Sequence, residues 1–170
     1  TCDVGQKEEI DKAVEATMKF FGCIDILVNN AAGCGGGKTL EQVDLEEWNR
    51  LLHLNLTSAY LFSMAVIPYM KEKQHGKICN VSSGAGIIGD ISDPHYAASK
   101  AGLIGLTKEM AIELAPYRIN VNALGTGLTD TRMSRKSLWD EKTKALRWYR
   151  VGTPTDQASA IVYLVSEAAE

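Results

Sequence analysis

Apolar residues along the chain alternate between helical and strand spacing, and this alternation predicts helices and strands in turn. The first helical stripe comprises Ile10, Val14, Met18 and Phe21. Gly22 follows this stripe and is placed to end the helix, because glycine adopts the left-handed conformation of a helix C-terminus at little cost. The apolar run 24–28 then predicts a short strand, which leads into Asn29, Asn30 and a glycine-rich loop.

Capping signals and prolines set the limits of the later elements. Asp44 followed by Glu47 predicts a capping-box start for a long helix, 44–73, which Pro68 should kink or break. The further elements expected are a strand at 77–83, a helix at 94–115, a strand at 119–124 and a helix from about 155. Asp93 followed by Pro94 is the expected start of the helix at 94–115. The apolar residues expected on the buried side of this last helix are Ile161, Val162, Leu164 and Val165.

Strands that alternate with helices in this way predict right-handed βαβ units and a parallel sheet. The expected fold class is therefore α/β, a doubly wound, Rossmann-like sheet that forms a single domain over 1–170. Such sheets bind ligands at the carboxyl ends of their strands. Polar or glycine-rich segments directly follow three of the strands, at 29–30, 82–83 and 125–127. We therefore expect these segments to line one cleft.

The composition narrows the class of protein. With 45% hydrophobic and 23% charged residues in 170, the chain has the make-up of a folded globular domain. Its net charge of −3 gives no reason to expect nucleic acid or an anionic membrane as a partner. The basic residues between 132 and 150 are interpreted as a solvated helix face, and no apolar run approaches the length of a membrane span. The four cysteines lack metal-binding spacing, which predicts reduced, structural thiols in the cytoplasm and no metal site.

Tyr96 and Lys100 form the first candidate for chemistry. Residues at i and i+4 share one face of a helix, so the two side chains can meet. A phenol with a pKa of roughly 10 is a poor acid–base group at neutral pH, and a neighbouring cation lowers that value. The spacing alone decides nothing, because Tyr69 and Lys73 share it.

The two tyrosines differ in what precedes them. Ser83 stands thirteen residues before Tyr96 at the end of a predicted strand, whereas Leu56 stands thirteen residues before Tyr69 inside a predicted helix. A hydroxyl at a strand end can reach a ligand carbonyl, and a leucine within a helix cannot. We therefore interpret Tyr69 as part of an exposed helix end and Tyr96 as the reactive residue.

Five segments of the chain resemble motifs of the classical short-chain dehydrogenase/reductase family. They are the strand-end asparagine motif at 29–33, the helix asparagine Asn55, Ser83 with the Y-x-A-S-K segment at 96–100, the segment at 121–131 near the nicotinamide, and Asp3, which matches the aspartate that contacts adenine. The five occur in the family's order and extend over nearly the whole chain, which makes them far more specific together than singly.

The resemblance implies a role for each matched residue. Tyr96 would exchange a proton with a carbonyl or alcohol oxygen, and Lys100 would lower the pKa of Tyr96 and bind the nicotinamide ribose. Ser83 would polarise the substrate oxygen, and the main chain of Asn55 would hold a water in a proton relay. The cofactor, NAD or NADP, would contact Asp3, Val4, Asn29, Ala31, Tyr96, Lys100, Gly127 and Thr131, with Thr131 fixing the carboxamide.

The resemblance also has two departures. Thr126 stands where the family has a proline before Gly127, which we interpret as tolerated because no reactive group is lost. The glycine-rich phosphate-binding turn that follows the family's first strand is nowhere in the sequence. We therefore expect that the chain is a fragment lacking roughly 60 residues at its N-terminal side, and also the family's last strand.

Three functional interpretations stay open on the sequence. The first is an NAD(P)-dependent oxidoreductase that interconverts a carbonyl and a secondary alcohol; the others are an inactive scaffold or oligomer partner, and an epimerase or dehydratase of the same family. The family further implies a homodimer or homotetramer formed through helices 44–73 and 94–115. His95 is interpreted as a wall of the substrate pocket or a surface contact. The aromatic residues expected either to line that pocket or to pack are Trp139, Trp148 and Tyr149.

Overall fold

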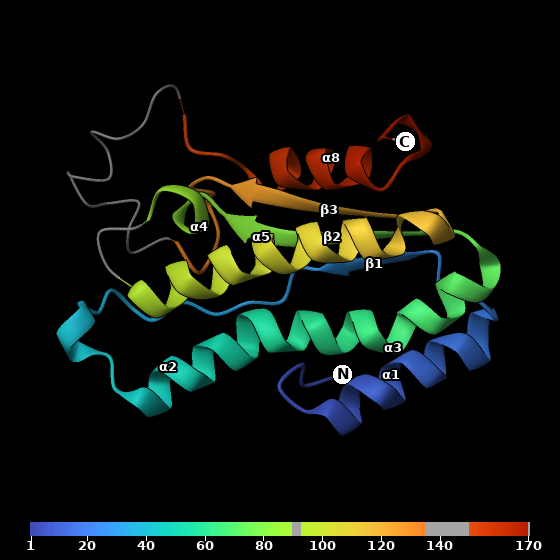
Figure 1. Ribbon diagram of the computed structural model, residues 1–170. Helices are drawn as coiled ribbons and strands as arrows, with labels where there is room; N and C mark the ends of the chain where they lie inside the picture. Colours follow the sequence, from blue (N-terminus) through green and yellow to red (C-terminus); the bar gives the residue numbers. More distant parts are fainter. Residues whose placement is uncertain (90–92, 135–149, 170) are drawn as a thin grey trace.

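The protein, described here by a computed structural model, is a three-stranded parallel sheet with helices on both faces (Figure 1). The structure describes residues 1–89, 93–134 and 150–169. The strands lie in the order β1-β2-β3, where β1 is Ile26–Asn29, β2 is Gly76–Ser83 and β3 is Ile119–Thr126. The parallel α/β sheet expected from the sequence is thereby confirmed. Trp139, Trp148 and Tyr149 lie outside the described residues.

The helices alternate with the strands along the chain. The main ones are α1 (Lys7–Phe21), α2 (Leu45–Leu52), α3 (Ser58–Lys73), α5 (Pro94–Leu114) and α8 (Pro154–Leu164), with the one-turn helix α4 (Ala85–Ile88) after β2. Short 3-10 turns occupy Leu40–Gln42, Ala115–Tyr117 and Glu167–Ala169. The predicted limits are mostly within two residues of these bounds, with Gly22 ending α1 at a φ of 75° and Asp44 accepting from the amide of Glu47.

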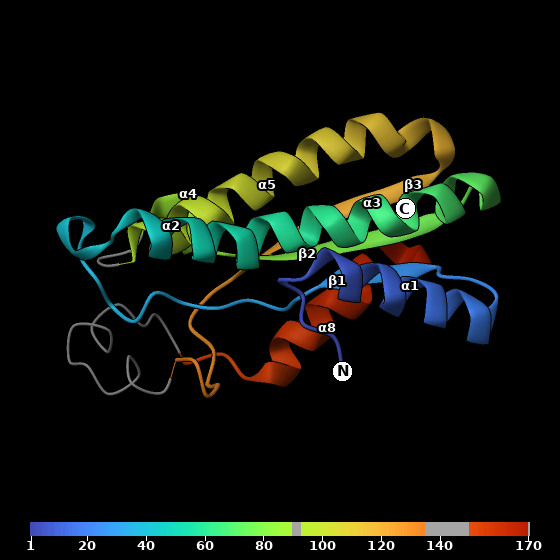
Figure 2. The ribbon, with the colours of Figure 1, turned by 90° about the horizontal axis from the view of Figure 1, so that it is seen from below.

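The helices form one layer on each side of the sheet. Seen from two directions, α3 and α5 lie side by side over one face with α1 next to α3, and α8 lies over the opposite face (Figures 1 and 2). All three strands run parallel, so their carboxyl ends meet at one edge of the sheet. The segments that follow β1, β2 and β3 are thereby brought together, as the sequence predicts.

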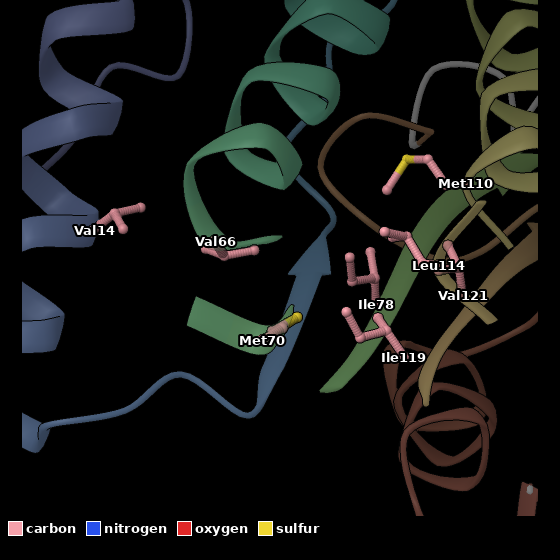
Figure 3. Close-up of a cluster of buried hydrophobic side chains, with 8 residues drawn as sticks. All are labelled: Val14, Val66, Met70, Ile78, Met110, Leu114, Ile119 and Val121. Carbon is pink, nitrogen blue, oxygen red and sulfur yellow. The ribbon is translucent and has the colours of Figure 1, made fainter. Parts of the chain in front are cut away.

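The core fills the space between the helices α1, α3 and α5 and the sheet. Its buried side chains are Val14, Val66, Met70, Ile78, Met110, Leu114, Ile119 and Val121 (Figure 3). Burying apolar side chains of this size stabilises the fold by roughly 1.5–3 kcal/mol each. This packing fixes α5 against β2 and β3, and α5 is the helix that carries Tyr96.

The structure corrects two expectations about the helix 44–73: that it breaks at Pro68, and that no apolar run approaches the length of a membrane span. The helix does not break at Pro68, because α3 runs through this exposed residue as far as Lys73. The irregular turn lies nearer the N-terminus of the helix, where η2 (His53–Thr57) forms a π-helical turn between α2 and α3. The continuous run Leu45–Lys73 is also long and apolar enough to cross a membrane by length and composition alone, with a mean hydropathy of 1.3. It nevertheless buries polar residues against its neighbours, as a core helix does.

The final helix is also less buried than the sequence predicts. Val162, expected on its buried side, is 65% exposed, whereas Ile161, Leu164 and Val165 are half-buried. The helix begins with a reciprocal capping box between Thr153 and Asp156, which satisfies backbone amides of its first turn.

Candidate active site

Helix α5 is hydrogen-bonded to the carboxyl end of β2. The hydroxyl of Ser82 donates to the carbonyl of Lys100 over 2.9 Å, and the ammonium Nζ of Lys100 donates to the carbonyl of Val81 over 2.8 Å. Ser83, the next residue of the strand, therefore lies close to the part of α5 that carries Tyr96 and Lys100. The structure brings these three predicted residues together at the expected edge of the sheet.

The ammonium of Lys100 is held beside the ring of Tyr96. Its Nζ lies 5.8 Å from the centroid of the ring. Lys100 is only 3% exposed, and this burial lowers its pKa to about 8. The pKa falls because desolvation disfavours the charged form of a lysine. A pKa of about 8 still lies above neutral pH, so the side chain is mostly charged at pH 7 and loses its charge as the pH rises past 8.

The hydroxyl of Ser83 takes part in the turn that follows β2. Its Oγ accepts from the amide of Ala85 over 3.2 Å, at the start of α4. The side chain of Ser83 therefore caps this turn by accepting a backbone hydrogen bond. This cap does not exclude a second role, because a hydroxyl can donate its own proton while it accepts.

Asn55 lies in the π-helical turn η2 and is 2% exposed. Its amide accepts from the backbone N–H of Gly33 over 2.8 Å and donates to the carbonyl of Gly33 over 3.0 Å. The same Nδ2 donates to the hydroxyl of Ser99 over 3.1 Å, and that hydroxyl donates to the carbonyl of Tyr96 over 2.7 Å. The side chain of Asn55 thus links the loop after β1 to α5, the helix that carries Tyr96.

A second link to the same loop comes from Asp93. The sequence predicts Asp93 only as a helix start, but its side chain makes no cap, and its φ is 71°. The carboxylate instead accepts from the amides of Gly37 and Lys38 over 2.8 and 3.0 Å, and the amide of Asp93 donates to the carbonyl of Lys38 over 2.8 Å. The only sequence signal for this link is the acidic residue before Pro94.

His95 is wholly buried, so its interpretation as a surface contact is wrong. Its ring lies beneath Gly35, where an added methyl group would be 2.0 Å from Cε1 of His95. Its Nε2 is 3.7 Å from Oε1 of Glu47, whose carboxylate also accepts from the ammonium of Lys38. That hydrogen bond from Lys38 is the main reason why the pKa of Glu47 lies below its usual range.

A pocket of about 150 Å³ opens beside the carboxyl end of β1. Its lining residues are Val4, Leu27, Val28, Asn29, Asn30, Ala31, Ser58 and Phe62. Three of the residues predicted to contact a cofactor, namely Val4, Asn29 and Ala31, are thus brought together. Ligands of drug size occupy roughly 300–1,000 Å³, so this pocket is smaller than a whole drug-sized ligand requires.

Three of the predicted cofactor residues, Asp3, Asn29 and Thr131, also make hydrogen bonds within the protein. The carboxylate of Asp3 accepts from the amide of Gly5 over 2.9 Å, in the turn that precedes α1. The amide of Asn29 donates to Asn80 over 2.8 Å and ties β1 to β2 within the sheet. Thr131 lies in the turn after β3, where its amide donates to the hydroxyl of Ser134 over 3.1 Å.

Thr126 is the last residue of β3, and Gly127 follows it. The carbonyl of Thr126 accepts from the amide of Gly84 over 2.9 Å, and its hydroxyl donates to the carbonyl of Ser82 over 3.1 Å. A proline has no hydroxyl and could not make this second bond. The residue that departs from the family pattern therefore adds a link between β3 and the strand end that carries Ser83. Gly127 is exposed directly after this link.

Comparisons with known proteins agree with this geometry. The model of the short chain dehydrogenase family matches residues 1–142. The chain is 38% identical over 168 residues to the 3-oxoacyl-acyl-carrier-protein reductase FabG of Thermotoga maritima, covering 97% of this chain and 68% of that protein. It is 40% identical over 174 residues to the dehydrogenase/reductase SDR family member 4 of Pongo abelii, covering 99% of this chain and 62% of that one.

A solved structure shows the same fold. The crystal structure of gox2181 superposes with a TM-score of 0.94 at 28% identity, covering 99% of this chain and 68% of the other. This chain thus spans about two thirds of the length of the proteins it matches. With a family match over most of its residues and this fold, the chain belongs to the short-chain dehydrogenase/reductase family of oxidoreductase enzymes.

Proposed function

We propose that this chain carries the catalytic site of an NAD(P)-dependent oxidoreductase that interconverts a carbonyl and a secondary alcohol, with Tyr96 as general acid and base. The observation that carries the proposal is the position of the ammonium of Lys100. It is fixed by the carbonyl of Val81 and lies 5.8 Å from the centroid of the Tyr96 ring. A buried cation at this place favours the phenolate form of the neighbouring tyrosine.

The residues of the chain divide the work of the reaction. The hydroxyl of Tyr96 gives a proton to the substrate oxygen during reduction and takes one during oxidation. The hydroxyl of Ser83 donates to the same oxygen and stabilises the charge that develops on it. Asn55 fixes the backbone around Tyr96 through Ser99, and its main chain is the proposed site of the relay water. The nicotinamide, when bound, supplies or accepts the hydride.

The cofactor would be held along the carboxyl edge of the sheet. The pocket beside β1 suits the adenine end, with Val4 and Ala31 on its walls and Asp3 next to it. Lys100 would bind the ribose of the nicotinamide, and Gly127 and Thr131 would place its carboxamide. This set of residues does not distinguish NAD from NADP, so the proposal covers both cofactors.

The substrate class follows from the relatives only in outline. One similar protein is named as a reductase of 3-oxoacyl-acyl-carrier protein and another as a dehydrogenase/reductase. A ketone or 3-oxoacyl thioester is therefore the first substrate to try, together with the matching secondary alcohols.

A matched pair of tyrosine variants tests the proposal. Tyr96→Phe removes the phenol at the site, whereas Tyr69→Phe removes the phenol from the other tyrosine that has a lysine four residues later. Oxidation of NADH and NADPH would be followed with a panel of ketones and 3-oxoacyl thioesters. We expect Tyr96→Phe to lower kcat/KM by at least about 10²-fold, the usual contribution of general acid–base catalysis, and Tyr69→Phe to change it less than about twofold.

The other functional interpretations predict different results. An inactive scaffold would show no turnover with the unaltered protein under any condition of the panel. An epimerase or dehydratase would consume substrate without net oxidation of the nicotinamide. Activity that survives Tyr96→Phe would refute the proposed role of this tyrosine.

We also propose a cytoplasmic homodimer or homotetramer that forms through helices 44–73 and 94–115. Large apolar side chains on these helices are exposed, with Tyr60 at 44%, Met64 at 49% and Ile112 at 74%. Sedimentation velocity would test the assembly. Met64→Glu should shift it toward monomer, whereas Phe20→Glu on α1 should leave it unchanged, and a monomeric parent protein would overturn the proposal. The free thiols of all four cysteines support a reducing compartment.

A further inference from the structure

We propose that His95 is a positioning residue, whose buried ring supports the glycine loop (residues 33–38) and thereby fixes the backbone around the reactive tyrosine. This inference rests on the proposed function of Tyr96. It concerns a residue that does not touch the reacting atoms, and it assigns a role to the buried titratable side chain of α5 that the proposed chemistry leaves unused.

The first observation is the contact between the loop and the ring. Gly35 is buried, and a methyl group added to it would lie 2.0 Å from Cε1 and 2.4 Å from Nε2 of His95. The backbone of Gly35 therefore lies directly against the imidazole, with no room for any side chain between them. The ring therefore sets the distance between the glycine loop and the first turn of α5.

The second observation is that the ring is polar and has no hydrogen bond to offset its burial. His95 is 0% exposed, and neither Nδ1 nor Nε2 has a hydrogen-bond partner within 1–89, 93–134 and 150–169. A buried polar group without a partner destabilises a fold, so its presence calls for an explanation. The nearest charged group is Glu47, whose Oε1 lies 3.7 Å from Nε2.

The third observation is that Glu47 connects the ring back to the same loop. Its other carboxylate oxygen accepts from the ammonium of Lys38, the last residue of the glycine loop. Glu47 belongs to α2, so helices α2 and α5 both hold Lys38, the first through this ion pair and the second through Asp93. The ring of His95 fills the space between these two attachments.

The loop is also bonded to the site at its other end. Gly33 is held on both its N–H and its C=O by Asn55, and Asn55 bonds to the hydroxyl that supports the carbonyl of Tyr96. A loop displaced at Gly35 would pull on Gly33 and, through Asn55, on the helix turn that carries Tyr96. Displacements of about 1 Å at such distances can reduce the rate by roughly 10²-fold.

A double-mutant cycle in the whole natural protein tests this role. Gly35→Ala forces the loop away from the ring, and His95→Ala removes the ring. Gly35→Ala alone should lower kcat/KM by on the order of 10²-fold. The same change in the His95→Ala background should cost about tenfold less, because the two closest contacts of the added methyl, both with the ring, are then gone, although Oδ1 of Asp93 stays 2.8 Å away. Ser159→Ala on the exposed side of α8, outside the proposed site and the proposed assembly helices, is the control and should behave as the parent.

Two further readouts separate positioning from stability and from the function itself. The pH profile of kcat should change in Gly35→Ala and be restored in the double variant, whereas a purely structural defect would only lower the fraction of folded protein. Hydrogen exchange at the amides of Gly37 and Lys38, which are bonded to Asp93, should speed up in Gly35→Ala and slow again in the double variant.

The exchange measurement needs no activity, so it tests the support of the loop even if the proposed reaction is not found. Additive effects of the two substitutions, or a Gly35→Ala variant that matches Ser159→Ala in rate and exchange, would overturn the role of His95. An inactive parent protein with the expected exchange pattern would instead overturn the proposed function alone.

Discussion

The buried amide of Asn55 donates a hydrogen bond to the hydroxyl of Ser99 over 3.1 Å, which joins the π-helical turn η2 to the helix that carries Tyr96. Asn55 is at the same time the buried side-chain partner of both backbone groups of Gly33. An amide is suited to this place because it donates and accepts at once, which neither a carboxylate nor an apolar side chain of its size can do.

Asn55→Ala should therefore destabilise the protein more than Ser99→Ala does. The first change leaves the N–H and C=O of Gly33 without their partner, at roughly 1–3 kcal/mol for each buried group. The second change removes one hydroxyl and should cost about 1 kcal/mol. Chemical denaturation of the two variants would measure the difference, and equal losses would show that the pairing with Gly33 contributes little.

The buried ammonium of Lys100 should make stability depend on pH. Its pKa in the folded protein is about 8, below its value of 10.5 in the unfolded chain, so between these two pH values the unfolded state binds more protons. The unfolding free energy contributed by Lys100 must then rise with pH across this window, by up to about 3 kcal/mol. The difference in unfolding free energy between the parent and Lys100→Met isolates this contribution. A difference that stays flat from pH 8 to 10.5 would contradict the lowered pKa.

The same titration should limit catalysis at alkaline pH. Above about pH 8 the cation beside Tyr96 is lost, and with it the stabilisation of the phenolate. In the reduction direction, kcat should therefore decline above this pH in the parent protein. Lys100→Arg keeps a cation that does not deprotonate in this range, so any residual activity of this variant should lack the decline.

The helices, the strands and the parallel sheet follow from local patterns, which is why they could be predicted. The spacing of Ser83, Tyr96 and Lys100 is a property of one strand, one loop and one helix, and the structure places them together. The carboxyl-end cleft follows from parallel strands alone. These features depend on few long-range contacts.

What could not be predicted depends on contacts between distant segments. Asp93 reads as a helix cap in sequence, but its bonds reach residues 55 and 56 positions away. The burial of His95 arises because a glycine of the same distant loop packs on it. The unbroken helix at Pro68 reflects the exposure of that residue, since water can satisfy a freed carbonyl there.

Gly86 should tolerate no side chain, because it lies against the backbone of α5. A methyl group added there would be 2.7 Å from the amide of Ala101 and 2.7 Å from the carbonyl carbon of Lys100. Backbone atoms cannot move aside as a flexible side chain can, so Gly86→Ala must push α4 away from α5. We expect a loss of about 1–3 kcal/mol in unfolding free energy and a fall in activity, because α4 directly follows Ser83. Ser159→Ala on the exposed side of α8 is the control, and equal stability of the two variants would refute the close contact.

The hydroxyl of Thr126 should stabilise the edge of the sheet without taking part in the reaction. It donates to the carbonyl of Ser82 over 3.1 Å, and so points at the neighbouring strand rather than at the substrate. Thr126→Val keeps the shape of the side chain and removes this bond, which should lower the unfolding free energy by about 0.5–1.5 kcal/mol. Thr126→Ser keeps the hydroxyl and should retain most of that stability, and both variants should keep kcat within about threefold of the parent. A large loss of kcat in Thr126→Val that Thr126→Ser restores would show instead that this hydroxyl acts in the site.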